Sequence, residues 1–249
     1  MYPKERLDNI MSILKENGYV TVKYLTEALH YSTATVNRDL NILEKRNLVR
    51  RSYGGVELAE RKIPPMTFRY HKMHTVKNNL VKKAAEYVKD GDTIFVDCST
   101  TTQGIGQYLI GKKDITVITN NLLLVSYLGE YGINVICLGG QLTESPAALF
   151  GALTVENASR YIVDKFFFST GCVTSDGNIL SAGISLLVHR AMAKNAKSVF
   201  YLVDHDKVNA LPNEILFDLN EVDYVISDYD FSPETKEKFI NTEFININS

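Results

Sequence analysis

The sequence predicts an α/β protein in which an N-terminal winged helix-turn-helix precedes a doubly wound domain with a mostly parallel sheet. Within residues 1–58, three amphipathic segments are followed by two short runs around a pair of glycines, which is the element order of a winged helix-turn-helix. From residue 76 onward, short apolar runs alternate with helical segments, as in parallel strands joined by crossover helices. The 45% hydrophobic content is enough for a packed core.

The N-terminal helices are predicted from apolar residues that recur at helical spacing. The three stripes consist of Leu7, Ile10, Met11 and Leu14, then Leu25 and Leu29, then Val36, Leu40 and Leu43. Gly18 stands where a helix C-cap is expected, and Thr21 and Ser32 are suitable N-caps for the second and third helices. The two short runs on either side of Gly54 and Gly55 predict a hairpin.

Residues 59–75 are predicted to form a linker, because they contain prolines and charges without a clear period. Residues 76–249 are predicted to form the second domain. Its buried strands are expected at 93–97, 115–119, 135–138, 166–169, 199–203 and 224–226, with helical segments between them. Because these runs are almost continuously apolar, the strands should be covered on both faces.

The net charge of −2 conceals an uneven distribution. Residues 1–75 contain 13 Lys and Arg against 8 Asp and Glu, whereas the rest of the chain contains 14 against 21. A small basic domain beside a larger acidic one favours binding of a polyanion at the N-terminal end. Chance clustering of charges is the alternative explanation.

The third predicted helix has a polar face suited to the major groove of DNA. With the aliphatic stripe turned inward, Arg, Asn, Thr and Lys side chains point outward, where they can pair with base edges or phosphates. The candidate DNA-binding residues are Ser32, Thr33, Thr35, Asn37, Arg38, Asn41 and Lys45 in this segment, and Arg50 and Arg51 in the hairpin. Arg50 and Arg51 alternate faces in a regular strand, so only one of them should reach a phosphate. The alternative is a solvated polar face on which Arg38 steadies the helix beside Asp39, a residue that we interpret as structural.

Two predicted strand ends carry side chains suited to an anion, and ligands of parallel sheets collect at the carboxyl ends of strands. The candidates are Asp97, Ser99, Thr100, Thr101 and Thr102 after one strand, and Asp204 and Lys207 after another. The hydroxyls lead into a predicted helix whose N-terminal amides favour phosphate, and a lysine adds a positive charge. Ordinary helix capping and a surface ion pair are the alternatives.

Residues 32–40 and 50–55 resemble the DeoR family of bacterial transcription regulators, which typically shows Ser-x-x-Thr-Ile/Val-Arg-Arg-Asp-Leu and then Arg-x-x-Gly-Gly. The resemblance covers nearly the whole chain. Further matches in the family's order are Pro65 to Arg69, residues 97–102, Thr119 and Asn120, Gly139 and Gly140, Gly151, Asp164 and Lys165, Gly171, and residues 204–207. The chain departs from the pattern at Asn37, Ser99 and Ser185, where the family usually has Arg, Gly and an acidic residue.

The resemblance implies a sensor domain related to ribose-phosphate isomerases, with a phosphorylated sugar as effector and with Asn120, Gly139, Gly140 and Gly171 bordering its site. It also implies a repressor of a sugar-metabolism operon that the effector releases from double-stranded operator DNA. We expect a homodimer or homotetramer on repeated or palindromic half-sites. One alternative is a sugar-phosphate isomerase with a DNA-binding module, in which Asp97, Asp204 and Lys207 would perform acid–base chemistry. Another is an interaction module with a non-functional pocket.

Other classes of protein are disfavoured. No apolar run is long enough to span a bilayer, and the charged start lacks the apolar core of a signal peptide, so we expect no membrane partner. Cys98, Cys137 and Cys172 lie in apolar stretches, which predicts reduced thiols and a cytoplasmic protein. The five histidines and three cysteines lack the spacing of ligands. We therefore expect neither a metal nor a cofactor, and we assign no catalytic residue.

Overall fold

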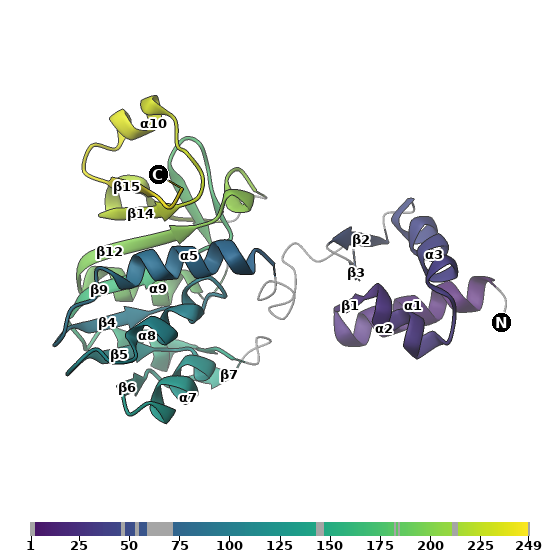
Figure 1. Cartoon of the computed structure of the whole chain (residues 1–249), viewed down its shortest axis with the longest axis horizontal. Coiled ribbons are helices and arrows are strands. Elements are labelled where there is room, and N and C mark those ends of the chain that lie inside the picture. Colours follow the sequence, from purple (N-terminus) through teal and green to yellow (C-terminus); the bar gives the residue numbers. More distant parts are fainter. Residues whose placement is uncertain are drawn as a thin grey trace. The chain divides into compact units, whose positions relative to one another are not determined.

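The computed structural model describes residues 3–45, 48–52, 55–58, 72–142, 147–181, 183, 185–210 and 214–248. The chain divides into two compact units, Met1–Lys72 and Met73–Ser249 (Figure 1). Most of the predicted linker, residues 59–71, lies outside the described residues. Helix α5 (His74–Ala85) includes the last two residues that the sequence analysis assigned to the linker. In the part of the chain that the structure describes, no helix is long and apolar enough to cross a membrane.

The N-terminal unit contains the predicted helices and hairpin. Its elements are α1 (Pro3–Asn17), β1 (Tyr19–Thr21), α2 (Val22–Leu29), α3 (Thr33–Lys45), β2 (Val49–Ser52) and β3 (Gly55–Leu58). Strand β1 was not predicted; it pairs with β3 and gives an antiparallel sheet of order β1-β3-β2. Gly18 ends α1 at a φ of 73°, and Thr21 caps α2 by accepting a hydrogen bond from the Tyr24 amide. The three apolar stripes form this unit's core, although Met11 and Leu29 are only partly buried.

The second unit is built on a seven-stranded parallel sheet, which confirms the predicted doubly wound fold. The sheet order is β15-β14-β12-β9-β4-β5-β6. Its strands are β4 (Thr93–Val96), β5 (Thr116–Thr119), β6 (Asn134–Cys137), β9 (Val163–Phe168), β12 (Ala196–Val203), β14 (Tyr224–Ser227) and β15 (Glu243–Asn246). All six predicted strands are present; β15, at the sheet's edge, was not predicted.

Helices cover both faces of this sheet. On one face lie α8 (Ala152–Ala158) and α9 (Ser185–Lys194), and on the other lie α5, α6 (Gly106–Leu109) and α7 (Leu122–Glu130). The side chains of β9 show the division, because Phe166 and Phe168 join the first core and Phe167 joins the second. Burial on both faces explains why the strands are continuously apolar in sequence.

Smaller elements complete this unit. They are the 3₁₀ turns η1 (Thr102–Ile105), η2 (His205–Lys207) and η3 (Leu219–Glu221), the pair β7 (Gln141–Leu142) and β8 (Leu149–Phe150), the antiparallel strands β10 (Cys172–Val173), β11 (Asn178–Ser181) and β13 (Glu214–Asp218), and helix α10 (Pro233–Lys238).

The strand order places a topological switch point between β4 and β9. From β4 the chain adds β5 and then β6 on one side, and it later adds β9, β12, β14 and β15 on the other side. Loops that leave neighbouring strands in opposite directions open a crevice at the carboxyl edge of the sheet, where ligands of such folds bind. The loops after β4 and β9 are therefore the place to look for a binding site.

Candidate functional site

The outer face of α3 presents the polar side chains that the sequence predicts there. Val36, Leu40 and Leu43 are buried and fix the orientation of the helix. Of the predicted DNA-binding residues in this segment, Thr33, Arg38, Asn41 and Lys45 are exposed, as is Ser32, and Thr35 and Asn37 are half-buried. Ser32 also caps the helix, because its Oγ accepts a hydrogen bond from the Thr35 amide at 3.3 Å.

Arg38 and Asp39 are neighbours on α3 with different surroundings. Asp39 is buried and pairs with Arg6 of α1, whose Nη2 donates to Oδ1 at 2.9 Å and whose Nε donates to Oδ2. The hydrogen bond to Asp39 is the main cause that raises the pKa of Arg6. Arg38 is exposed and has no hydrogen-bond or ion-pair partner among the described residues. Asp39 thus joins two helices, and the Arg38 guanidinium remains available to a ligand.

The two arginines of β2 point to opposite sides of the strand. Arg50 pairs across the hairpin with Glu57, since its Nε and Nη2 donate to Oε1 at 2.8 and 2.5 Å. Arg51 faces α3 instead; its Nη1 donates to Oδ1 of Asn41 at 2.7 Å and its Nη2 donates to Oδ1 of Asn37. Arg51 therefore belongs to the polar surface of α3, and Arg50 is held by a buried carboxylate.

In the second unit, the predicted effector-binding residues follow neighbouring strands at the carboxyl edge of the parallel sheet. Asp97 follows β4, Asn120 follows β5 and Asp204 follows β12. Ser169, which was not among the predicted effector-binding residues, follows β9 and belongs to the same group. Strands β12, β9, β4 and β5 are consecutive in the sheet, so the four loops meet at one edge.

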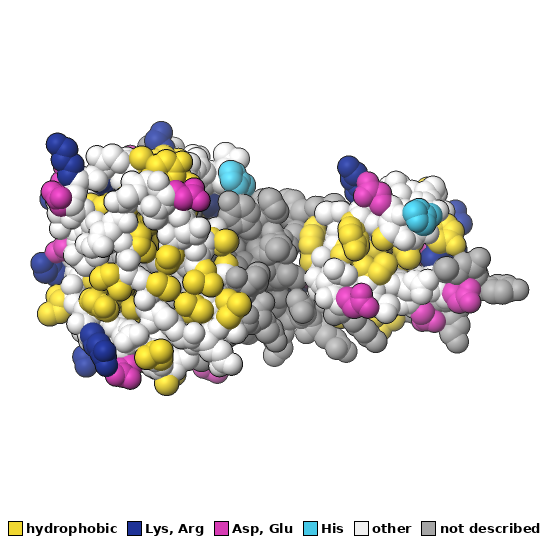
Figure 2. Space-filling model, turned by 90° about the horizontal axis from the view of Figure 1, so that it is seen from below, with side chains coloured by type: hydrophobic (Ala, Val, Ile, Leu, Met, Phe, Trp, Pro, Cys, Tyr) yellow, Lys and Arg dark blue, Asp and Glu magenta, His cyan; other side chains and the backbone are white. Residues whose placement is uncertain are grey.

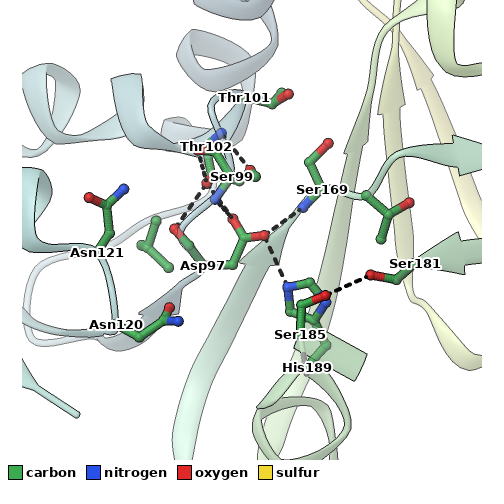
Figure 3. Close-up of polar contacts among 12 residues, drawn as sticks. Asp97, Ser99, Thr101, Thr102, Asn120, Asn121, Ser169, Ser181, Ser185 and His189 are labelled. Atoms are coloured by element: carbon green, nitrogen blue, oxygen red, sulfur yellow. Dashed lines mark hydrogen bonds and ion pairs between the residues drawn. The ribbon is translucent and has the colours of Figure 1, made fainter. Parts of the chain in front are cut away.

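Asp97 organises the loop after β4 (Figure 3). Its buried carboxylate accepts hydrogen bonds from the amides of Ser99 and Ser169 at 3.1 and 3.2 Å and from the Thr102 hydroxyl. Nε2 of His189, a buried residue of α9, lies 3.1 Å from Oδ2 of Asp97. The carboxylate thereby ties together the loops after β4 and β9 and helix α9. Its contacts are those of a structural anchor.

Two lysines approach the adjacent hydroxyls of this loop. Nζ of Lys207 donates to Oγ1 of Thr101 at 2.8 Å and to Oγ of Ser169 at 2.9 Å. Nζ of Lys77, a buried residue of α5, donates to Oγ1 of Thr100 at 3.1 Å. Two ammonium groups held beside neighbouring hydroxyls make this part of the sheet edge suitable for an anion.

The helix expected after the loop is replaced by two short segments. The four-residue 3₁₀ turn η1 is followed by the four-residue helix α6. Segments of this length have little macrodipole, so the positive charge of the site comes from the lysines and not from a helix N-terminus. Ser99 and Thr102 bond to each other at 2.9 Å between their Oγ and Oγ1 atoms, and in this way they hold the loop in shape.

Several buried polar atoms around the loop have no hydrogen-bond partner in the described part of the chain. They include Oδ1 of Asn120, Nδ2 of Asn121, Nδ1 of His189 and Oδ2 of Asp204. Oδ2 of Asp204 does form an ion pair, at 3.4 Å from Nζ of Lys207. Figure 3 shows Asn120 and Asn121 next to the loop that starts at Asp97. Buried polar groups normally have partners, so these atoms suit a ligand that carries both donors and acceptors.

The three predicted glycines differ in their structural roles. Gly140 has a φ of 122°, and a β-carbon there would lie 2.1 Å from Oγ1 of Thr154 and 2.7 Å from the Phe150 carbonyl oxygen. Close packing therefore accounts for a glycine at this position. Gly139, at a φ of 70°, accepts a hydrogen bond from Thr154 Oγ1 at 2.8 Å through its carbonyl oxygen. Gly171 is exposed between β9 and β10.

Two family models together match almost the whole chain. A DeoR-like helix-turn-helix domain matches residues 6–62, and a DeoR C terminal sensor domain matches residues 72–229. The chain belongs to the DeoR family. Its winged helix-turn-helix and its sensor domain make it a DNA-binding transcriptional regulator.

Relatives in the DeoR family align over nearly their full length. The HTH-type transcriptional repressor GlcR of Bacillus subtilis is 33% identical, with 92% of this chain and 89% of the relative covered. The lactose phosphotransferase system repressor of Lactococcus lactis is 31% identical over 96% of both chains. The glycerol-3-phosphate regulon repressor of Escherichia coli is 29% identical over 92% of both chains.

Solved structures show weaker similarity to this DeoR-family chain. Ribose 5-phosphate isomerase A from Neisseria gonorrhoeae is 17% identical, with 54% of this chain and 53% of the isomerase covered and a TM-score of 0.40. The eIF2B delta subunit from Chaetomium thermophilum is 16% identical, with 84% and 77% covered and a TM-score of 0.47. Both TM-scores are below 0.5, so the fold is assigned from the chain's own strand order.

Lys77 and His189 contact the loop after β4 and were not among the candidates predicted from the sequence. A signal was nevertheless present, because each lies on the apolar stripe of its helix. Lys77 is three and four residues before Leu80 and Val81, and His189 is three residues before Met192; all of these are buried. A charged or polar residue on a buried stripe indicates an internal partner.

Proposed function

We propose that this DeoR-family regulator represses genes of carbohydrate use and is released from its operator by a phosphorylated sugar. The observation that carries the proposal is the pair of lysines, Lys77 and Lys207, on the adjacent hydroxyls of Thr100 and Thr101. Such a pair suits a dianion such as phosphate at the carboxyl edge of a parallel sheet. The names of relatives support sugar chemistry, because two refer to glycerol-3-phosphate and to a lactose phosphotransferase system.

The buried polar atoms that lack a hydrogen bond around the loop after β4 support a polyhydroxylated ligand. Oδ2 of Asp204 and Oδ1 of Asn120 accept hydrogen bonds from hydroxyls, and Nδ2 of Asn121 donates to a hydroxyl or carbonyl oxygen. A sugar phosphate supplies both a charged end and hydroxyls of this kind. An unphosphorylated sugar lacks the group that the lysines match, so we expect it to act poorly as an effector.

The position of Lys77 supports a route from the ligand to the DNA-binding domain. Lys77 lies in the first turn of α5, which begins at His74, two residues beyond the segment 59–71. Its backbone amide donates to the Met73 carbonyl oxygen at 2.9 Å, and its side chain reaches Thr100. A phosphate that draws the Lys77 ammonium away from Thr100 would therefore act on the turn that receives the connection from the DNA-binding domain.

Replacement of Lys207 tests the effector site. We expect Lys207→Ala to bind a duplex from its own upstream region normally, because Lys207 belongs to the sensor domain. Release by a sugar phosphate should require about 10–100 times more ligand, the range expected for losing a hydrogen bond to a charged group. Fluorescence anisotropy of the labelled duplex, titrated with a panel of phosphorylated and free sugars, measures both quantities.

Lys197→Ala is the matched control for Lys207→Ala. Lys197 pairs with Asp164 near the starts of β12 and β9. It therefore lies at the amino ends of the strands, whereas Lys207 lies beyond their carboxyl ends. This variant should respond to the sugar phosphate like the wild type. An unchanged response in Lys207→Ala would reject the proposed site.

We further propose that the protein acts in the cytoplasm as a homodimer or homotetramer, and not as an isomerase. The engagement of Asp97 in four internal contacts supports a role without turnover. Large apolar side chains exposed on the sensor domain are Ile110, Leu123, Tyr131, Leu142, Leu153, Ile162, Leu187, Ile215, Tyr229 and Ile240. Figure 2 shows apolar side chains gathered on one face of this domain, as at a surface that pairs with another subunit. Light scattering of the full chain measures the oligomeric state.

A further inference from the structure

The contact of Arg51 with α3 determines how two asparagines present their amides. Asn37 and Asn41 are one helical turn apart on the outer face of α3, and one guanidinium bonds to Oδ1 of each. A guanidinium can only donate hydrogen bonds. Each amide must therefore turn its oxygen toward Arg51 and its Nδ2 hydrogens away from it, so the chemistry of the partner fixes both orientations.

We propose that Arg51 is a specificity-determining residue of the wing that acts through Asn37 and Asn41. It makes both asparagines donors toward the groove, and it thereby favours guanine or thymine over adenine at the bases that they face. Asparagine reads adenine by accepting from N6 and donating to N7 of the same base. An amide whose oxygen is turned toward Arg51 presents its Nδ2 donors to the groove, and these match guanine O6 and N7 or thymine O4.

The surroundings of Arg51 support a positioning role rather than a phosphate contact alone. Arg51 and Asn37 are both half-buried, so their hydrogen bond is partly shielded from water. Bonds from a guanidinium are charge-assisted and directional, and its planar fork spans two acceptors in a way that a lysine ammonium does not. Arg50, held by Glu57, makes no such contact with α3 in the described structure.

Selection from a pool of duplexes with a randomised central segment tests the inference, which rests on the proposed role of α3 in reading DNA. The full-length chain is compared with Arg51→Lys, Arg51→Ala, Asn37→Ala and Asn41→Ala, after thermal unfolding has shown that each variant folds. Arg51→Lys is the decisive variant, because it keeps the positive charge and loses the fork. Affinity for an unrelated duplex is measured alongside.

We expect the wild type to enrich guanine or thymine at the positions that lose their preference in Asn37→Ala and Asn41→Ala. Arg51→Lys should bind the unrelated duplex within about twofold of the wild type, yet discriminate against adenine at those positions at least about fivefold less. The inference is overturned if Arg51→Lys selects the wild-type sequence and Arg51→Ala weakens all duplexes equally, or if the wild type selects adenine at these positions. If no asparagine variant alters the selected sequence, the reading role of α3 itself fails.

Discussion

Arg38 and Asp39 show how adjacent residues of one helix differ in function. We expect Arg38→Ala to lower affinity for a duplex from the upstream region by about 1–3 kcal/mol if the guanidinium reads a base, with no change in the unfolding midpoint. Asp39→Asn should instead lower the unfolding midpoint of the DNA-binding domain, because it breaks the ion pair with Arg6. Anisotropy titrations and thermal unfolding of both variants check this. Equal loss of stability in the two variants would contradict the assignment.

His205 gives the sensor domain a pH-dependent contribution to stability. Its Nδ1 lies 2.5 Å from Oδ2 of Asp228, and this hydrogen bond is the main cause that raises the pKa of His205. The protonated form is favoured in the folded state, so the contribution is fully present below the unfolded-state pKa of about 6.5. It is lost as pH rises through the higher folded-state pKa.

The measurement is the free energy of unfolding of the wild type and of His205→Gln across this pH window. The difference between the two proteins should shrink as pH rises, and because His205 is half-exposed the effect should be small. A difference that grows with pH would show that the histidine is neutral in the pair. Because His205 starts the turn that carries Lys207, the effector response is worth recording at the same pH values.

At the scale of elements, Gly140 lies in the loop after β6 and packs closely against Thr154 of α8. Gly140→Ala combines an unfavourable φ with a clash against Thr154 and the Phe150 backbone. Gly111→Ala has a similar positive φ, 90°, with no atom within 4 Å of the added carbon, so it reports backbone strain alone. Chemical denaturation should show both variants destabilised, with Gly140→Ala worse by about 1–3 kcal/mol because of overpacking. Equal destabilisation would mean that the packing around Gly140 relaxes freely.

Elements with strong periodicity were predictable, and short or mixed ones were not. The strands around Phe95 and Phe167 are continuously apolar because both faces of the sheet are covered. Strand β15 lies at the sheet edge with side chains that are exposed or only partly buried, and β1 has three residues, so neither has a clear pattern. A short edge strand depends on its partner more than on its own sequence.

The candidate sites were predictable to a similar extent. Residues next to strand ends, such as Asp97 and Lys207, could be placed at one edge once a parallel sheet was predicted. Their hydrogen bonds could not, because Lys207 meets Thr101 across 106 positions of the chain and His189 meets Asp97 across 92. The contact of Arg51 with two asparagines likewise depends on the packing of the wing against α3, which periodicity does not give.

At the scale of the whole molecule, the two units have separate cores and should unfold separately. The helix-turn-helix core and the two cores of the sensor domain share no residue. We expect calorimetry of the full chain to show two transitions, of which a saturating sugar phosphate shifts only the one of the sensor domain. At a ligand concentration about 100 times the Kd, that domain should gain about 2.7 kcal/mol. A single transition that moves as a whole would show that the units are thermodynamically coupled.

The order of strands in the sheet also bears on incomplete chains. Lys207 follows β12 and meets a loop that follows β4, so the proposed anion site can form only after most of the polypeptide has left the ribosome. The helix-turn-helix emerges first and has its own core, and N-terminal domains generally fold first during synthesis. A premature stop codon between these points would leave a fragment that retains α3 but lacks the proposed effector site, and we expect such a fragment to compete with the intact regulator for the same DNA.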